Sequence, residues 1–316
     1  MSILKKKTAF LFPGQGSQSV GMLDELSTHF PKIIETYAKA SKVLGYDLWQ
    51  LVQTDTNGEL HQTEKTQPAL LAGGVALFKV WQANQGEMPH FMAGHSLGEY
   101  TALVCAGVLD YSDAIRLVAL RGCLMQEAVP RGTGGMAAIV GLSDAQVQQI
   151  CEQAAQNQVL SPANFNAIGQ TVIAGELPAI ERAIGLAKQA GAKIAKQIPV
   201  SVPSHCALMK PAADQLANHL KKLTFQPPII PVLNNADVAC YENPAQICDA
   251  LVRQLYQPVR WVESIQWFAK QGISRLIECG PGKVLTGLNK RIVADMPTLP
   301  ISTHEGLMQA LEGVAA

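Results

Sequence analysis

The chain alternates short apolar runs with longer segments in which apolar residues recur at helical spacing. Four short runs predict buried strands, at 8–12, 90–95, 229–234 and 275–279. The apolar, Ala-rich segment 68–81 predicts a helix between the first two strands, and two further helices are predicted at 97–107 and 112–126. Strands that alternate with helices in this way are typical of an α/β fold with a parallel sheet.

The segment 128–199 has a different order of predicted strands and helices from the rest of the chain. After the turn-rich stretch PRGTGG (130–135), the predicted order is strand, helix, strand, strand, helix, strand, at 136–142, 143–151, 160–165, 171–174, 178–190 and 193–198. Ser143 is the expected N-cap of the first of these helices. This order is the ferredoxin-like arrangement. We therefore expect a small ferredoxin-like subdomain of residues 128–199, inserted into a large α/β domain formed by 1–127 and 200–316.

Composition and charge narrow the class of protein. The 316 residues are 48% hydrophobic, which is enough for a substantial core. Lys and Arg balance Asp and Glu at a formal net charge of +0, so we expect no binding to nucleic acid or to a membrane surface. No apolar run approaches the roughly 18 residues of a transmembrane helix. The seven scattered cysteines form no CxxC pair, which favours reduced thiols and a cytoplasmic protein.

The segment AGHSLGEY (93–100) places Ser96 between two glycines, after a predicted strand and before a predicted helix. This pattern is typical of the nucleophile elbow of serine acyl-transfer enzymes, because the glycines permit close packing of strand and helix. The helix begins at Leu97 and directs its backbone N–H groups toward the serine. The pattern predicts that Ser96 is a nucleophile, and the alternative is a tight Gly-Ser turn without chemistry.

A nucleophilic serine needs a base, and the chain has seven histidines. His205 lies in a Pro-bounded extended segment before a predicted helix, where rigid neighbours can position a general base. His95 is adjacent to Ser96, but neighbouring side chains diverge at an elbow, so we expect a packed or hydrogen-bonded residue there. Cys206 is not predicted to be a nucleophile, because adjacent side chains on an extended segment point to opposite faces.

The turn FPGQGSQ (12–18) directly follows the first predicted strand. It lacks the GxxxxGK[ST] pattern of a phosphate-binding loop, so no nucleotide site is expected. The backbone N–H of Gln15, together with that of Leu97, would supply the two donors that an oxyanion hole needs. The alternative is a simple glycine-rich turn.

Arg121 lies within a mostly apolar predicted helix. An arginine in such a helix must pair, extend to solvent or face a cavity. Arg116, five positions earlier, falls on a different face and is the one expected to be solvated. A carboxylate on the substrate would pair with Arg121 through a bidentate contact. The alternative is a structural salt bridge.

Five motifs occur in order along the chain: FPGQGSQ (12–18), GHSLGE (94–99), RG (121–122), VPSH (202–205) and ECGPGKVL (278–285). Together they resemble the malonyl-CoA:acyl carrier protein transacylases of type II fatty-acid synthesis, which are related to the acyltransferase domains of polyketide synthases. The resemblance covers essentially the whole chain at matching spacing. It implies an α/β-hydrolase-like core with a ferredoxin-like insert.

The resemblance also implies roles for single residues. Ser96 matches the nucleophile that becomes a malonyl ester, His205 matches its general base, and Arg121 matches the arginine that binds the free malonyl carboxylate. Gln15 and Leu97 fall where backbone amides form the oxyanion hole.

Three further positions follow from the same resemblance. Gln254, in RQLYQPV (253–259), matches the residue whose backbone carbonyl orients the histidine in place of an acidic third member. Asn164 and Asn166 fall where the insert meets the cleft, and a structural turn is the alternative there. The residues before His205 differ from the tyrosine-containing pattern of methylmalonyl-selective relatives, which favours malonyl.

The activity implied is a ping-pong transfer of the malonyl group from malonyl-CoA to the phosphopantetheine thiol of acyl carrier protein, without a metal or other cofactor. Such a transfer supplies extender units for fatty-acid synthesis. One alternative is a serine thioesterase or esterase, which shares the elbow, the base and the oxyanion hole. Arg121 and the lack of a recognisable acidic triad partner count against it. A second alternative is a non-catalytic carrier-binding protein, which would form no covalent adduct.

Overall fold

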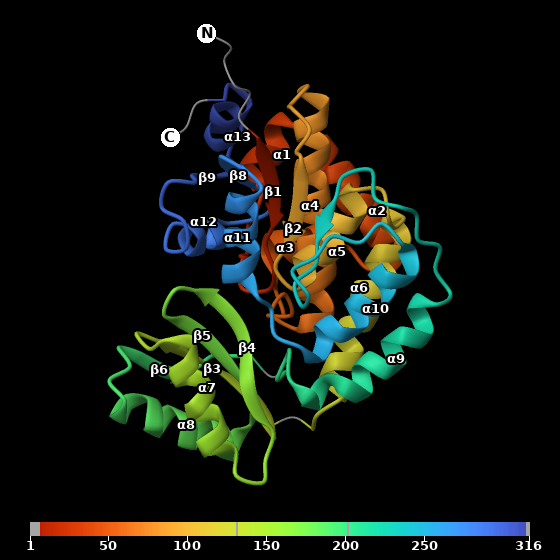
Figure 1. The fold of residues 1–316 in the computed structure, drawn as a ribbon. Helices are drawn as coiled ribbons and strands as arrows, with labels where there is room; N and C mark the ends of the chain where they lie inside the picture. Colours follow the sequence, from red (N-terminus) through yellow and green to blue (C-terminus); the bar gives the residue numbers. More distant parts are fainter. Residues whose placement is uncertain (1–6, 131, 201, 314–316) are drawn as a thin grey trace.

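The structure is a computed structural model that describes residues 7–130, 132–200 and 202–313. Arg131, in the predicted linker, and Ser201, in the predicted extended segment, lie outside the described residues. Two sheets organise the fold, and Figure 1 shows them as a large part that carries both ends of the chain and a smaller part below it. The larger sheet is parallel and the smaller one is antiparallel. The predicted α/β fold class is confirmed.

The parallel sheet has the strand order β7-β2-β1-β8-β9. Its strands are β1 (Thr8–Phe12), β2 (Phe91–Gly94), β7 (Val232–Leu233), β8 (Arg275–Glu278) and β9 (Thr298–Pro300). β1 is central and buried on both faces, as its unbroken apolar run TAFLF requires. Phe10 and Phe12 pack into the core on one face of the sheet, and Ala9 and Leu11 into the core on the other.

Helices cover both faces of this sheet (Figure 1). They are α1 (Asp24–His29), α2 (Lys32–Leu44), α3 (Leu48–Thr54), α4 (Thr63–Ala83), α5 (Leu97–Cys105), α6 (Tyr111–Glu127), α9 (Lys210–Leu220), α10 (Pro244–Tyr256), α11 (Trp261–Lys270), α12 (Val284–Asn289) and α13 (His304–Leu311). A 3₁₀ turn, Ala207–Met209, leads into α9. The nearly all-buried α4 packs against α2, α5 and α6.

Two of the predicted elements in this part had wrong boundaries, and one strand was not predicted. α4 begins at Thr63 rather than at Pro68, which lies inside the helix. Its ring removes one backbone hydrogen bond, and the burial of the helix on both sides of Pro68 offsets that loss. The strand predicted at 229–234 is reduced to Val232–Leu233, and β9 was not predicted. Both are short strands at the two edges of the sheet and have prolines beside or within them.

The smaller sheet has the strand order β4-β5-β3-β6 and is antiparallel throughout. Its elements are β3 (Gly134–Val140), α7 (Asp144–Ala155), β4 (Leu160–Ala167), β5 (Gln170–Glu176), α8 (Leu177–Gln189) and β6 (Ile194–Gln197). This is the β-α-β-β-α-β order predicted from the sequence. Ser143 is the N-cap of α7 and forms a capping box with Gln146, as its position predicted.

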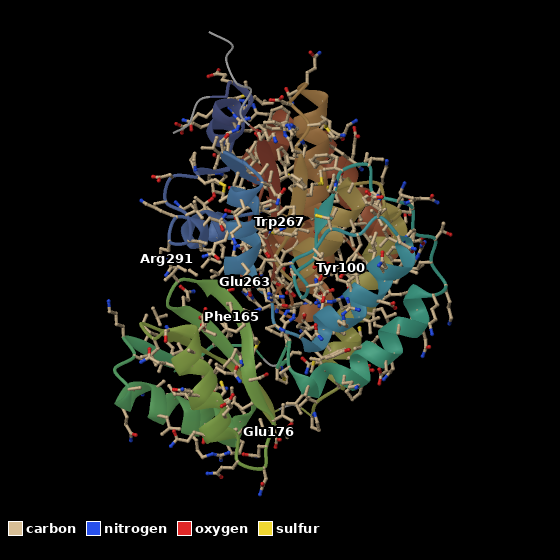
Figure 2. The ribbon with its side chains drawn as sticks, viewed as in Figure 1. Tyr100, Phe165, Glu176, Glu263, Trp267 and Arg291 are labelled. Atoms are coloured by element: carbon tan, nitrogen blue, oxygen red, sulfur yellow. The ribbon has the colours of Figure 1, made fainter. Side chains whose placement is uncertain are left out.

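The two parts meet along β4. The N–H of Phe165 donates to the carbonyl of Val259 (3.0 Å), and the N–H of Val259 donates to the carbonyl of Ala163 (2.9 Å). Figure 2 shows Phe165 at this boundary, whereas Glu176 lies at the opposite end of the small sheet. The backbone bonds fix β4 against the segment that joins α10 to α11. Within the described ranges, no helix is both long and apolar enough to cross a membrane.

Candidate active site

Ser96 lies on a sharp turn between β2 and α5, at φ 51° and ψ −106°. This conformation is costly for a residue with a side chain, and strain of this kind is typical of functional sites. The turn requires glycine on both sides. A Cβ at Gly94 would lie 1.8 Å from the carbonyl carbon of Gly98, and a Cβ at Gly98 would lie 1.9 Å from the carbonyl oxygen of Phe12. The predicted elbow is present, with the strand, turn and helix in the expected order.

His205 is within hydrogen-bond distance of the serine. Its Nε2 lies 2.8 Å from Ser96 Oγ, and its Nδ1 lies 2.7 Å from the backbone carbonyl of Gln254. Because a carbonyl only accepts, Nδ1 carries the proton, and Nε2 of the neutral ring is left to accept from the serine hydroxyl. Burial, and then the charge of Arg121, lower the pKa of His205 to about 3. The imidazole is therefore neutral at physiological pH, with Nε2 unprotonated.

Arg121 approaches the serine from α6. It is 1% exposed, and its Nη2 donates to Ser96 Oγ (3.2 Å) and to Gln254 Oε1 (3.1 Å). Its Nη1 donates to Gln67 Oε1 (2.7 Å), and its guanidinium carbon lies 5.2 Å from the centroid of the Tyr100 ring. Burial lowers the pKa of Arg121, but a guanidinium remains protonated in proteins.

The predicted contrast between the two arginines of α6 is present in the structure. Arg116 is exposed and forms an ion pair with Asp113, at 3.1 Å. Arg121 is held by side-chain oxygens of neutral residues instead, next to the reactive hydroxyl. The structural salt bridge considered as an alternative for Arg121 is not formed among the described residues.

A cavity of about 560 Å³ opens onto Ser96. Its walls come from both parts of the protein, and the residues that line it are Gln15, Gly16, Gln18, His61, Thr63, His95, Ser96, Leu97, Arg121, Met125, Met136, Asn164, Asn166, Val172, Ile198, Pro199, Val200, Val202, Ser204 and His205. Every predicted site residue except Gln254 is therefore on the wall of one cavity. Gln254 is fully buried behind the wall, in contact with Arg121, His205 and Ser96.

The two residues predicted to supply backbone amides lie on this wall. Leu97 is the first residue of α5, so its N–H is one of those without a partner inside the helix. The side chain of Gln15 accepts a hydrogen bond from Thr63 (2.9 Å), which fixes the loop that carries its backbone N–H. The loop also lies tightly against the elbow, since a Cβ at Gly14 would lie 2.4 Å from the carbonyl oxygen of His95.

The insert contributes two amides to the cavity. Asn166 Oδ1 is 2.8 Å from His95 Nε2, so His95 is hydrogen-bonded, as expected, rather than positioned as the base. Asn164 forms a bridge with Val259 at the junction of the two parts. Cys206 is buried, with its thiol directed at the carbonyl of Pro203, and burial raises its pKa to about 11. This environment agrees with an unreactive thiol.

Sequence reasoning missed two buried residues that hold the elbow. Asn235 accepts a hydrogen bond from the N–H of Ser96 (2.7 Å) and donates to the carbonyl of Gly94 (2.6 Å). Glu99 accepts from the side chains of Asn234 (2.6 Å) and Gln254 (2.8 Å). In the sequence these residues show only as an Asn-Asn pair at the end of the predicted strand 229–234 and an acidic residue three positions after the serine, and neither feature matches a known motif by itself.

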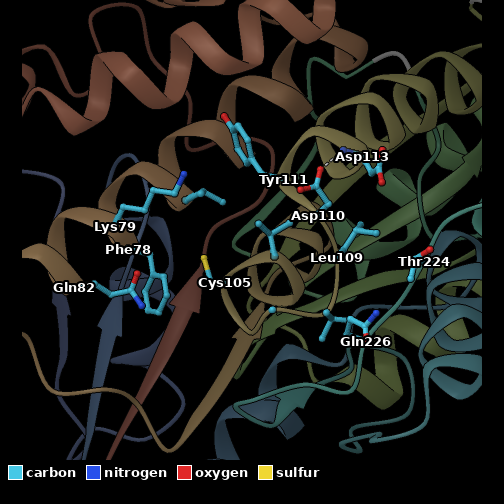
Figure 3. Close-up of a pocket in the computed structure, with 14 residues that line it drawn as sticks. Phe78, Lys79, Gln82, Cys105, Leu109, Asp110, Tyr111, Asp113, Thr224 and Gln226 are labelled. Carbon is cyan, nitrogen blue, oxygen red and sulfur yellow. Dashed lines mark hydrogen bonds between the residues drawn. The ribbon is translucent and has the colours of Figure 1, made fainter.

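A second cavity, of about 530 Å³, lies between α4 and the start of α6. Figure 3 shows Lys79 of α4 beside Tyr111, with Cys105 below them. The Lys79 ammonium lies 5.0 Å from the centroid of the Tyr111 ring, and burial raises the pKa of the Cys105 thiol. This cavity has no histidine among its described lining residues, so it does not repeat the nucleophile–base pair. No group of three or more His, Cys, Asp or Glu residues suited to a metal ion occurs in the described part of the chain.

The depressed pKa of His205 makes a prediction about acid stability. Between pH 6.5 and about 3 the unfolded chain binds a proton at this histidine and the folded chain does not. The free energy of unfolding should therefore fall as the pH falls through this window, by up to about 1.4 kcal/mol per pH unit from this group. His205→Asn removes the effect. Urea titrations give the free energy of unfolding of the wild type and of His205→Asn, and the difference in favour of the wild type should become smaller from pH 7 to pH 4. A difference that does not change with pH would contradict the lowered pKa of His205.

Comparison with known proteins agrees with this geometry. The model of the acyl transferase domain family matches residues 9–308. The chain belongs to the acyl transferase family. Within this family it is similar to the malonyl CoA-acyl carrier protein transacylase of Salmonella typhimurium, with 59% identity over 96% of this chain and 98% of that protein. The resemblance found in the motifs is thus confirmed.

Solved structures of the acyl transferase family have the same two-part fold. One is the malonyl CoA-acyl carrier protein transacylase from Coxiella burnetii, with a TM-score of 0.97 and 51% identity over 98% of both chains. Another is a type II polyketide synthase acyl-carrier protein in complex with its malonyl-transacylase, with a TM-score of 0.96 and 55% identity over 97% of this chain and 99% of that one.

Proposed function

We propose that this acyltransferase moves the malonyl group from malonyl-CoA to the phosphopantetheine thiol of acyl carrier protein through a malonyl ester on Ser96. The position of Ser96 Oγ carries the proposal, since it lies 2.8 Å from the base nitrogen of His205 and 3.2 Å from the Arg121 guanidinium. His205 can accept the proton of the hydroxyl group, and Arg121 supplies a fixed positive charge beside it. The names of the relatives, and the complex of one of them with a carrier protein, support the same substrates.

In the first half of the reaction, His205 Nε2 accepts the hydroxyl proton as Ser96 Oγ attacks the thioester carbonyl of malonyl-CoA. The backbone N–H groups of Gln15 and Leu97 stabilise the negative oxygen of the tetrahedral intermediate. The C–S bond then breaks, and the imidazolium returns the proton to the leaving CoA thiolate. The products of this half are CoA and a malonyl-serine ester.

The second half reverses these steps with a different thiol. His205 accepts the proton of the phosphopantetheine thiol, whose sulfur attacks the ester carbonyl. The same two amides hold the oxyanion, and the Ser96 alkoxide leaves with the proton from His205. The carbonyl of Gln254 keeps Nδ1 protonated throughout, so an acidic third member is not required.

Arg121 selects the acyl group in this scheme. The free carboxylate of a malonyl group would receive charge-assisted hydrogen bonds from the guanidinium, whereas an acetyl group would leave that buried cation without an anion. Each such bond contributes about 1.5 to 3 kcal/mol, which corresponds to about tenfold selectivity or more.

We infer that the reaction uses no metal or other cofactor, because each step needs only the serine, the imidazole, two amides and the guanidinium. A cytoplasmic location is proposed from the free cysteines and from substrates that belong to that compartment. We also propose that residues 1–127 and 200–316 form the large domain, residues 128–199 form the small one, and Asn164 and Asn166 shape the wall that contacts the bound acyl group.

Hydrolysis is the alternative that the same serine and base would perform. The two activities separate when the protein is incubated with malonyl-CoA, with and without holo acyl carrier protein, and the products are measured by mass spectrometry. The proposal requires malonyl-carrier protein to form much faster than free malonate. Faster release of malonate in the presence of carrier protein would favour a thioesterase and overturn the proposal.

A further inference from the structure

Glu99 is a buried acidic residue that the proposed mechanism does not use. It lies in the first turn of α5, is 3% exposed, and accepts hydrogen bonds from Asn234 Nδ2 (2.6 Å), the N–H of Asn235 (3.0 Å) and Gln254 Nε2 (2.8 Å). A buried carboxylate is costly unless donors or a cation compensate it. The positive charge of Arg121 acts on Glu99, yet no direct ion pair joins the two in the described structure.

The side-chain amide of Gln254 lies between these two charges. Its Oε1 accepts from Arg121 Nη2 (3.1 Å), and its Nε2 donates to Glu99 Oε2 (2.8 Å) and to the carbonyl of Ser96 (3.0 Å). A reversed amide would set its NH₂ against the guanidinium and its oxygen against two acceptors. The flanking charges therefore fix one orientation of the amide, and the amide keeps the charges apart.

The separation matters because opposite charges attract strongly at a buried site. If the amide were removed, the guanidinium would move toward Glu99 and away from Ser96 Oγ, which it now contacts at 3.2 Å. Glu99 would then compete with any carboxylate on the substrate. The backbone carbonyl of residue 254, which orients His205, would remain.

We propose that the Gln254 side chain is a spacer that determines acyl specificity: it holds Arg121 apart from Glu99 and so keeps the guanidinium available to the acyl carboxylate. Gln254 and Glu99 are positioning residues, since both act through Arg121. The inference rests on the proposed malonyl transfer and adds to it a function for this side chain, distinct from the function of its backbone carbonyl.

Gln254→Ala tests the spacer. We expect the ratio of kcat/KM for malonyl-CoA to that for acetyl-CoA to fall about tenfold or more, because an internal carboxylate now occupies the guanidinium. Adding Glu99→Gln removes the competing charge. The double variant should regain a ratio within about threefold of the wild type, a recovery that simple damage to the structure would not produce.

The matched control is Asn289→Ala. Asn289 is another fully buried, hydrogen-bonded amide, which contacts Trp261 and Thr298 outside the cavity. Its loss should lower the urea midpoint as Gln254→Ala does and leave the malonyl-to-acetyl ratio unchanged. Assays at pH 8 keep Glu99 ionised, since burial raises its pKa to about 7.

A binding measurement separates this inference from the proposed function. In a Ser96→Ala background, calorimetry compares the affinities for malonyl-CoA and acetyl-CoA without turnover. The spacer predicts that Gln254→Ala weakens malonyl-CoA alone and that Glu99→Gln reverses the loss, even if the wild type transferred no malonyl group and the proposed function failed. An unchanged preference in Gln254→Ala, or no recovery in the double variant, would overturn the spacer.

Discussion

Ser96→Ala is expected to lower malonyl transfer by about 10⁴-fold or more and to abolish the covalent malonyl adduct. Removing the nucleophile of a serine enzyme leaves only the rate that binding and the oxyanion donors supply. The elbow accepts alanine without a clash, because the substitution removes one oxygen and leaves the Cβ in place. The fold should therefore persist, and the loss of activity is attributable to chemistry.

The measurement is intact-protein mass spectrometry after incubation with malonyl-CoA, followed by a carrier-protein transfer assay. Ser161→Ala, in β4 of the small sheet and outside the cavity lining, is the matched control and should keep both the adduct and the rate. A malonyl mass increment that survives in Ser96→Ala would show that another residue is the nucleophile.

The second large effect is expected at Arg121. Arg121→Ala should lower kcat/KM for malonyl-CoA by about 10- to 150-fold, the equivalent of one charge-assisted hydrogen bond, while some acetyl transfer remains. Arg121→Lys should recover only part of the loss, since an ammonium keeps the charge without the planar fork. The readout is competition between malonyl-CoA and acetyl-CoA for the enzyme.

The control for this series lies on the same helix. Arg116 lies five residues before Arg121, and its exposed guanidinium pairs with Asp113. Arg116→Ala removes this guanidinium. Surface pairs of this kind contribute little, so activity and selectivity should both be unchanged. If malonyl still strongly outcompetes acetyl in Arg121→Ala, the guanidinium is not what binds the carboxylate.

Much of the fold could be predicted because short sequence patterns determine many of its elements. The apolar run of β1, the glycines around Ser96 and the capping serine at 143 each act over a few residues, and each was found where the pattern placed it. The edge strands were harder. β9 has three residues, so its pairing with β8 is decided by the sheet and not by its own composition.

The site also contains residues that the sequence could predict and residues that it could not. Ser96, His205 and Arg121 lie in recognisable motifs, although their mutual distances depend on segments far apart in the sequence. Glu99 and Asn235 gave no comparable signal, because their importance arises only when a loop 136 residues away closes over the elbow. No periodicity reports such a contact, and only the assembled structure supplies the acceptor that each donor needs.

The cavity between the two sheets also determines the order of events. CoA and the carrier protein each carry their sulfur on a long, narrow pantetheine chain, and both chains must bring that sulfur to the acyl carbonyl beside Ser96 Oγ through the same cavity of about 560 Å³. The donor must therefore withdraw before the acceptor enters, and the ester stores the malonyl group in the interval. Because the donor and the acceptor use the same cavity, they must bind in turn. Free CoA should therefore compete with the carrier protein for binding to the malonyl-enzyme.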